Sequence, residues 1–167
     1  MDRIEITVDT SPVDALLERL NDRLEDKTQP MAEIGEVLVS SIRWNFREQR
    51  SPSGEKWKPS RRAQREGGQT LIDTGRLQNS IDAQAYPDRV EVGTNVPYAA
   101  PLQLGATIPA HVIRARNAKA LRFVIGGQVI FRRSVNHPGA TIEPREFLGV
   151  RDEDWLEIED ILLRWLQ

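Results

Sequence analysis

The apolar residues between Pro30 and Glu48 recur at helical spacing, and this pattern constrains the fold more than any other feature of the sequence. Its members are Ile34, Val37, Leu38, Ile42 and Phe46, with the small Ser41 among them. Residues three and four positions apart share one face of an α-helix, so the pattern predicts a helix from Pro30 to about Glu48. The buried stripe of such a helix needs a second element to pack on.

Two further segments show the same periodicity. Val13, Leu16, Leu17, Leu20 and Leu24 predict an earlier helix, from about Pro12 to Thr28, and a strand at 4–8 precedes it. Residues 152–166 predict a C-terminal helix with acids in its first turn. The residues expected to face inward on this helix are Trp155, Ile158, Leu162 and Trp165. Helices are thus expected near both ends of the chain.

The middle of the chain is rich in strand and turn signals. Residues 81–86 and 89–94 predict a hairpin with a Pro87-Asp88 turn, and 98–104 predict one or two helical turns that end at Gly105. Three more strands are expected at 111–116, 121–125 and 128–135, the last two joined by Gly126-Gly127. The predicted fold is a single α+β domain over 1–167. Two long N-terminal helices and a C-terminal helix pack on an antiparallel sheet of about four to six strands.

A long basic segment, Arg47–Thr70, interrupts these elements. Among its 24 residues the only apolar side chains are Trp57 and Ala63, so we expect a loop that cannot build a core. Loops of this length are usually functional, or ordered only against a partner. Two roles remain open for Trp57, an exposed anchor for a partner or a side chain folded back onto the domain.

Composition excludes several classes of chemistry. The 167 residues contain no cysteine and two histidines, which rules out disulfide scaffolds, thiolate metal sites and cysteine nucleophiles. His111 and His137 have no motif around them, and no convergent acidic set suggests a metal or a cofactor. No targeting segment or membrane-length apolar run is present, so we expect a soluble protein made in a cytoplasm.

Charge is unevenly distributed along the chain. Residues 47–66 have seven bases and three acids, and 92–142 have six bases and no acid. Residues 1–46 have ten acids and five bases, and 143–167 have eight acids and three bases. These segments are either ordinary solvated faces or surfaces that meet phosphate or a partner of opposite charge.

The sequence Asp73-Thr74-Gly75 is typical of the catalytic loop of an aspartic protease. That chemistry needs two carboxylates that share a proton, and one chain supplies only one such motif. A homodimer could supply the second carboxylate, but Arg76, three residues on, would favour a permanently ionised Asp73. We therefore expect Asp73 or Thr74 to cap a short helix that carries Leu77 and Ile81.

Four segments in series, SGEKWKPSRRAQ, LIDTGRLQNSI, VGTNVPYAAPLQLG and HPGATIEPREFLG, resemble the phage virion morphogenesis family. These are the tail-completion or neck proteins of long-tailed phages, including Mu-like ones. The resemblance covers roughly residues 30–150 and implies that the segment from Thr74 to Leu77 begins a short helix beside the sheet. Residues 109–135 form a longer strand-rich insertion than the shortest relatives have, and its role is left open.

The resemblance implies a structural virion protein, not an enzyme, that forms a ring at the neck. The ring would be a hexamer that contacts head–tail connector and tail terminator or tube proteins, with phage DNA possible in its lumen. Closed rings use two different patches on each subunit, for which opposite charge is suitable. The residues expected at such interfaces are Trp57, Arg61, Arg62, Arg65, Tyr98, Arg145, Phe147, Leu148, Asp152, Glu153 and Asp154.

Two functions from other classes stay open at this point. One is DNA binding, with the basic loop as a phosphate clamp whose affinity would fall steeply with salt. The other is a dimeric aspartic protease acting through Asp73.

Overall fold

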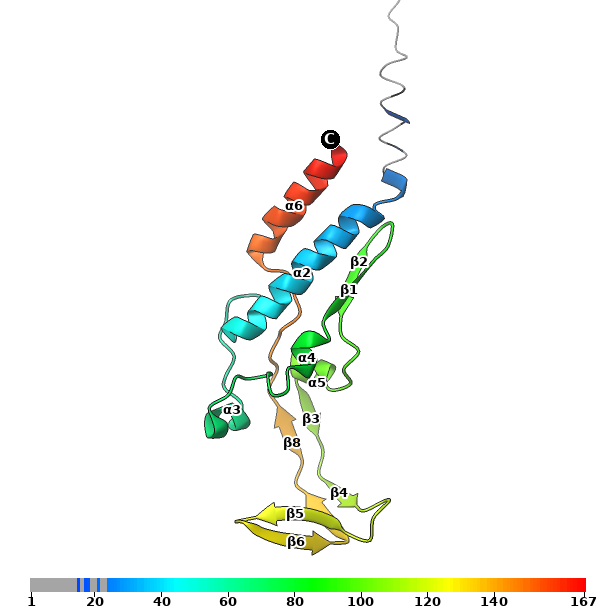
Figure 1. The fold of residues 1–167 in the computed structure, drawn as a ribbon. Helices are drawn as coiled ribbons and strands as arrows, with labels where there is room; N and C mark the ends of the chain where they lie inside the picture. Colours follow the sequence, from blue (N-terminus) through cyan, green and yellow to red (C-terminus); the bar gives the residue numbers. More distant parts are fainter. Residues whose placement is uncertain (1–14, 16, 19–20, 22–23) are drawn as a thin grey trace, which may run out of the picture. The chain divides into compact units, whose positions relative to one another are not determined.

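The computed structural model describes residues 15, 17–18, 21 and 24–167, which form two compact units (Figure 1). The helical unit comprises the described residues up to Val96 together with Phe147–Gln167, and the arm comprises Pro97–Glu146. The predicted strand at 4–8 and about half of the positions of the helix predicted for 12–28 lie outside the described residues.

The helical unit contains helices and one hairpin. Its elements are α2 (Thr28–Glu48), α3 (Arg61–Glu66), α4 (Arg76–Asn79), β1 (Asp82–Ala85), β2 (Val90–Gly93) and α6 (Asp152–Leu166). The helix predicted for 30–48 is confirmed as α2, which begins two residues earlier than expected. It ends where Gln49 takes a left-handed conformation, with a φ angle of 58°, and its backbone N–H bonds the carbonyl oxygen of Phe46.

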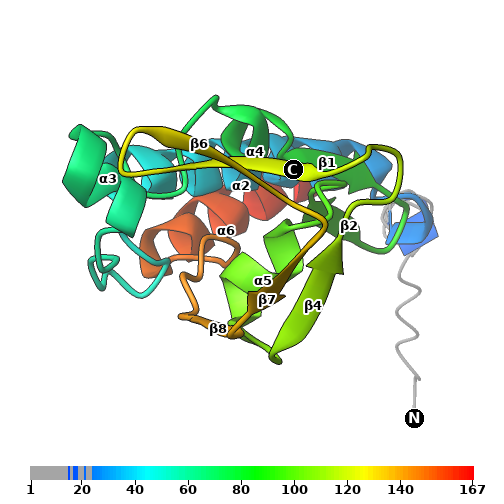
Figure 2. The same cartoon turned by 90° about the horizontal axis from the view of Figure 1, so that it is seen from below.

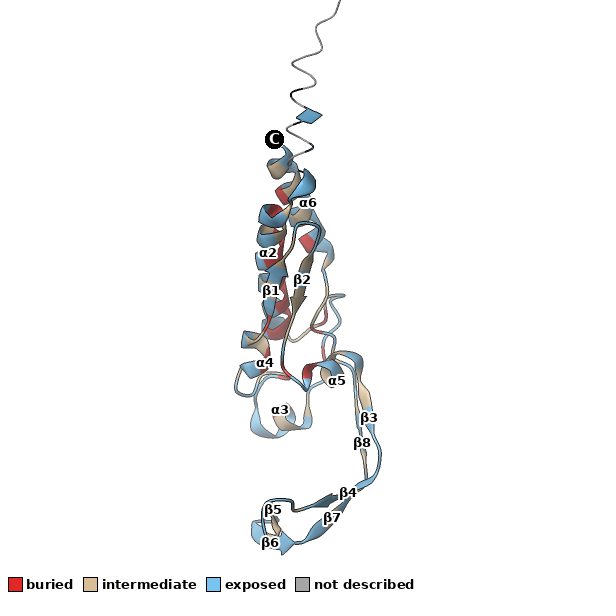
Figure 3. Cartoon of the chain, turned by 90° about the vertical axis from the view of Figure 1, so that its right-hand side faces the viewer, coloured by how far each residue is buried: buried red, intermediate tan, exposed pale blue. Residues whose placement is uncertain are grey.

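Helix α2 packs against the β1–β2 hairpin and against α6, and the buried residues follow its length (Figure 3). Ile34, Leu38 and Ile161 are the buried centre of this contact. Half-buried residues surround them: Met31, Val37, Val90, Val92, Ile158 and Leu162. Gly35 lets the hairpin come close, since a Cβ at this position would lie 2.9 Å from that of Ala83.

A second cluster lies at the C-terminal end of α2. Phe46 and Phe147 are fully buried, with ring centroids 5.3 Å apart. Trp57 packs edge-on against Phe46 at 5.6 Å. The cluster joins the end of α2, the segment after it and the residue that returns from the arm, so it ties together parts of the chain about a hundred residues apart.

The arm is a series of nested antiparallel pairs. Its strands are β3 (Ala106–Ile108), β4 (His111–Arg114), β5 (Leu121–Ile125), β6 (Gln128–Arg132), β7 (Ser134–His137) and β8 (Ala140–Ile142). They pair β3 with β8, β4 with β7 and β5 with β6, and Figure 2 shows β4 beside β7. Helix α5 (Ala99–Leu104) precedes them and ends at Gly105, as expected.

The α+β class is confirmed, but the predicted single sheet of about four to six strands is wrong. Among the described residues the strands form four separate two-stranded sheets. The β1–β2 hairpin and the Gly126-Gly127 turn were correctly predicted, because both depend on local turn residues. The nested pairing of β3 with β8 and of β4 with β7 joins residues too far apart for local patterns to specify.

Candidate interaction surfaces

The basic segment Arg47–Thr70 is folded onto the helical unit, so the expectation that it cannot contribute to a core is wrong. Trp57 is only 8% exposed, and its backbone N–H donates to the carbonyl oxygen of Gln49 at 2.8 Å. Ala63, on α3, is also buried. Of the two roles left open for Trp57, the structure shows the one in which the ring folds back onto its own domain.

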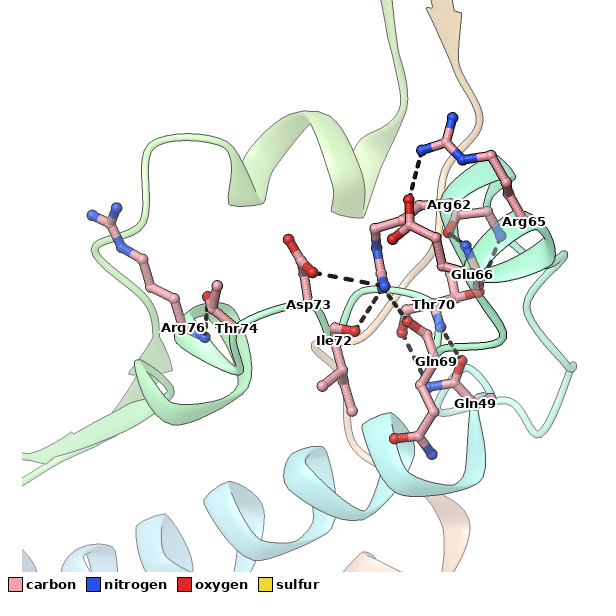
Figure 4. A network of polar contacts seen from close by, with 12 residues as sticks. Gln49, Arg62, Arg65, Glu66, Gln69, Thr70, Ile72, Asp73, Thr74 and Arg76 are labelled. Atoms are coloured by element: carbon pink, nitrogen blue, oxygen red, sulfur yellow. Dashed lines mark hydrogen bonds and ion pairs between the residues drawn. The ribbon is translucent and has the colours of Figure 1, made fainter. Parts of the chain in front are cut away.

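Arg62 holds the end of this segment in place (Figure 4). Its guanidinium donates to the carbonyl oxygens of Gln69 and Ile72, each at 2.6 Å. The side chain of Gln49 both accepts from the N–H of Thr70 at 2.6 Å and donates to its carbonyl oxygen at 3.0 Å. Arg62 thus has a structural role that sequence reasoning missed.

Arg61 and Arg65, the other arginines proposed for an interface, lie on exposed positions of α3. Arg65 pairs with Glu66 at 2.6 Å, and the hydrogen bond from Arg65 lowers the pKa of the Glu66 carboxyl. This pair is solvent-exposed and contributes little to stability. The accessible basic surface of α3 is therefore made by Arg61 and Arg65 rather than by all three arginines.

Asp73 is an exposed residue that lies beside Arg62. Its side chain is 74% exposed and lies 3.7 Å from Arg62, while the side chain of Arg76 points away from it (Figure 4). Gly75 occupies the N-cap of α4, and of the two residues expected to cap this helix only Thr74 bonds its first turn, because its hydroxyl accepts from the backbone N–H of Arg76 at 3.4 Å. Within 24–167 and the other described positions, no three acids or histidines cluster as a metal site would require.

The three acids in the first turn of α6 differ in how exposed they are. Asp152 and Glu153 are exposed, as an interface role requires, but Asp154 is 3% exposed. Its carboxylate accepts from the hydroxyl of Ser41 at 2.6 Å and from the Arg151 guanidinium at 3.0 Å. Asp154 therefore joins α6 to α2 and is unavailable to another protein.

Trp44 is a surface residue that the sequence analysis did not select. It is partly exposed, and the guanidiniums of Arg50 and Arg151 lie 5.2 and 4.7 Å from its ring centroid. Cations at these distances are attracted by the face of the indole. The sequence held one signal for this surface, since Ser41 is a polar residue inside an apolar stripe and a buried polar group requires partners. The partners of Ser41 are Arg151 and Asp154, and Arg151 is also the residue that lies over the Trp44 ring.

The remaining predicted interface residues fall into both units. Phe147 is buried in the aromatic cluster and Leu148 is half-buried, so Phe147 is a core residue rather than an interface residue. Tyr98, in the arm, is exposed. Arg145 is largely covered, and its backbone N–H donates to Leu102 at 2.7 Å.

The two histidines face each other in the arm. His111 and His137 are register partners in the β4–β7 pair, and their rings stack at 5.0 Å. The Nδ1 of His137 accepts from the N–H of Gly139 at 3.1 Å, and Nδ1 of His111 lies 2.9 Å from the Pro109 carbonyl oxygen. Each ring thus helps to fix the backbone where one strand pair gives way to the next.

The described chain is an α+β protein with exposed arginines on α3, exposed acids on α6 and an arm built of two-stranded pairs. The chain belongs to the phage virion morphogenesis family, whose sequence model matches residues 8–167. No curated protein and no solved structure matches it. No helix in the described part of the chain is long and apolar enough to cross a membrane.

Proposed function

We propose that this protein completes the phage tail and joins it to the head as a closed ring at the neck. The family match over residues 8–167 carries the proposal, because it makes the chain a virion morphogenesis protein. The role is structural, and its mechanism is binding rather than turnover. Its neighbours are the head–tail connector on one side and tail terminator or tube proteins on the other.

The distribution of charge supports assembly as a ring. Residues 92–142 have six bases and no acid, whereas residues 143–167 have eight acids and three bases. A closed ring is built from head-to-tail contacts, in which one patch of each subunit meets a different patch of the next. Patches of opposite charge favour this arrangement over contacts between like patches. Six-fold symmetry would match the tail parts that the ring contacts.

A phage in which this gene is deleted, complemented by a plasmid copy, tests the proposal. Without the plasmid we expect separate filled heads and tails in the lysate, and with it joined particles. The mass of the protein recovered from purified necks should correspond to six copies. Normal particles in the absence of the protein, or one copy per particle, would contradict the proposal.

DNA binding is a second candidate, favoured by the six bases of residues 92–142. Binding through the segment 47–70 loses part of its support, because Arg62 is engaged with the backbone of the chain itself. An electrophoretic shift measured at two salt concentrations distinguishes the candidates. Binding through phosphates weakens steeply with salt, by roughly 10³–10⁵-fold between 50 and 200 mM for six to ten phosphate contacts.

A further inference from the structure

One face of the β5–β6 hairpin, at the end of the arm, is apolar and exposed. The register pairs Arg122 with Phe131 and Val124 with Val129. Paired residues lie on the same face of a ribbon, and successive residues alternate between faces. Val124, Val129 and Phe131 therefore share one face with Arg122, and all four are exposed. We call these four residues the arm-tip face.

The β5–β6 ribbon that carries the arm-tip face has too few strands to be stable by itself in water. An isolated two-stranded ribbon is marginally stable, and it needs a third strand or a packed layer on one side. In Figure 3 most of β5 and β6 is pale blue and the rest is tan, and none of their residues is buried, so the described parts of the arm do not cover the ribbon with such a layer. An apolar face on a ribbon of this kind marks a contact with another chain.

Helix α6 exposes a second apolar surface. Its buried side carries Asp154 and Ile161, and Trp155 points to solvent with 58% of its surface exposed, contrary to the sequence expectation. Other apolar side chains on the outside are Leu156, Leu163 and Leu166, of which Leu156 is 71% exposed. At about 100° per residue, these four residues lie within roughly 120° of the helix circumference.

Acids lie within the same stripe of α6. The helical spacing places Glu159 and Asp152 between Trp155 and Leu163, and Asp160 beside Leu156. All three acids are exposed, and Asp160 is also paired with Arg164 at 3.0 Å, which leaves Asp152 and Glu159 as the acids available to a basic partner. We call the four apolar residues and these three acids the outer face of α6. It is apolar and acidic, whereas the arm-tip face is apolar and carries Arg122.

We propose that the arm-tip face of one copy packs on the outer face of α6 of a second copy. Apolar side chains would meet apolar side chains, and Arg122 would meet acids of α6. Basic residues outside the face, such as Arg114, Lys119 and Arg132, reinforce this complementarity because residues 92–142 contain no acid. The contact joins two different patches, so it is head-to-tail and extends from copy to copy.

The inference deepens the proposed function, since it names the surfaces that would close the ring, and it rests on that function only for the number of copies. The predicted N-terminal helix is a competing occupant of the outer face of α6. Residues 1–46 have ten acids and five bases, so their charge opposes an acidic surface, whereas the charge of the arm favours it.

Disulfide crosslinking tests the contact cleanly because the chain contains no cysteine. We would place single cysteines in the full chain by Val129→Cys on the arm and Leu156→Cys on α6. Asp88→Cys, in the exposed turn of the β1–β2 hairpin, is the matched control. Differently tagged variants are mixed at high concentration, oxidised mildly and separated without reductant.

We expect a disulfide-linked heterodimer from Val129→Cys with Leu156→Cys and a loss of that band when Asp88→Cys replaces either partner. A double variant carrying both cysteines should give a ladder of oligomers. Arg122→Glu should lower the yield severalfold, and Glu159→Arg on the other partner should restore it. Restoration by an opposite charge would not follow from a merely structural effect of Arg122→Glu.

Several results would overturn the proposal. A monomer of altered mobility from the double variant would mean that the arm folds back on its own helix. Crosslinks between two Val129→Cys copies would mean that arms pair with each other. An internal crosslink between Leu17→Cys and Leu156→Cys would mean that the N-terminal segment covers α6.

The same double variant in phage particles separates this inference from the proposed function. Infectious particles that contain the protein but give no ladder, together with no heterodimer in solution, would overturn the contact and leave the function intact. A ladder in solution from a protein that is absent from joined particles would overturn the function and leave the contact.

Discussion

The Ser41 hydroxyl on α2 donates a hydrogen bond of 2.6 Å to the Asp154 carboxylate in the first turn of α6. The two residues are 113 positions apart in sequence and both are buried. Arg151 completes the group, because its Nε donates to the Ser41 oxygen at 2.7 Å and its backbone N–H donates to Asp154 at 2.8 Å. One hydroxyl therefore links the helix that precedes the arm to the helix that follows it.

Ser41→Ala should destabilise the chain by about 1–3 kcal/mol, because it leaves buried charged groups without one of their partners. Urea denaturation followed by circular dichroism measures the change. Ser40→Ala is the matched control, since Ser40 is exposed on the same helix. Equal stability of both variants would show that the Ser41–Asp154 bond contributes nothing.

Trp57→Ala should cost about 3–5 kcal/mol, the usual range for removing a large aromatic side chain from a core. Its ring packs against Phe46 in the buried aromatic cluster. Trp155→Ala removes the same side chain from an exposed position and should change the free energy of unfolding by no more than about 0.5 kcal/mol. Guanidinium denaturation of both variants compares them directly, and a small loss for Trp57→Ala would exclude its core role.

Hydrogen exchange should find protected amides within the segment 50–68, which the sequence predicted to be mobile in the free protein. The N–H of Ser51 donates to Glu55 at 2.8 Å, that of Gly54 to Ser51 at 2.9 Å and that of Gly67 to Ala63 at 2.9 Å. Such bonds slow exchange because the amide exchanges only while the bond is open, and the open fraction falls exponentially with the free energy of opening. Uniformly fast exchange across 50–68 in the isolated chain would support the mobile loop instead.

Gly35→Leu should strongly destabilise the packing of α2 on the hairpin, because even a Cβ would lie 2.9 Å from that of Ala83 and 3.2 Å from Cγ2 of Val90. Overpacking of this kind typically costs about 1–3 kcal/mol. Glu36→Leu, at the adjacent exposed position, should have little effect. Thermal unfolding of the pair gives the comparison, and equal melting temperatures would mean that the hairpin can move away from the helix without loss.

Neutralising exposed charges should leave the chain folded and impair assembly. Asp152, Glu153 and Glu157 are the acids to change, because Asp154 is buried and its loss would destabilise the junction between α2 and α6. Arg61 and Arg65 form the matched basic pair, which spares Arg62 and its two backbone bonds. Exposed charges contribute about 0–1 kcal/mol each, so the combined variants are the informative ones.

Ring formation by the unaltered chain should also weaken with salt, since the Debye length falls from about 10 Å at 0.1 M to about 3 Å at 1 M. Tail joining in the complementation assay and ring formation at the two salt concentrations provide the measurements. Full infectivity from both combined variants, with assembly independent of salt, would mean that these charges form only a solvated surface.

Local patterns predicted several elements of both units well. The stripe on α2, the Pro87-Asp88 turn and Gly105 after α5 each depend on neighbouring residues, so the sequence was sufficient. The orientation of α6 was wrong at Trp155, because the predicted stripe did not allow for a buried acid. Ser41 draws Asp154 inward, and the helix is thereby turned so that Trp155 faces solvent.

The candidate interaction surfaces were harder to predict, because they depend on which side chains already bond other residues of the same chain. Arg62 and Arg65 are indistinguishable by composition, yet one binds two carbonyl oxygens and the other pairs only with a neighbouring acid. Trp57 reads as isolated in its segment because its partner, Phe46, belongs to the preceding helix. Such choices follow from tertiary contacts, which a local pattern does not contain.

Because the strand pairs of the arm are nested, the length of the arm can change without any change at its first strand pair, β3–β8. The chain enters through β3 and leaves through β8, and these strands are register partners, with Ala106 opposite Ile142. Inserting one residue on each side of the ribbon would move the hairpin at Gly126-Gly127 outward by about 3.3 Å and leave that base unchanged. Insertion in pairs of residues on each side would also keep every side chain on its present face. The length of the arm can therefore change in steps, by insertion or deletion of residues, while the helical unit keeps its sequence.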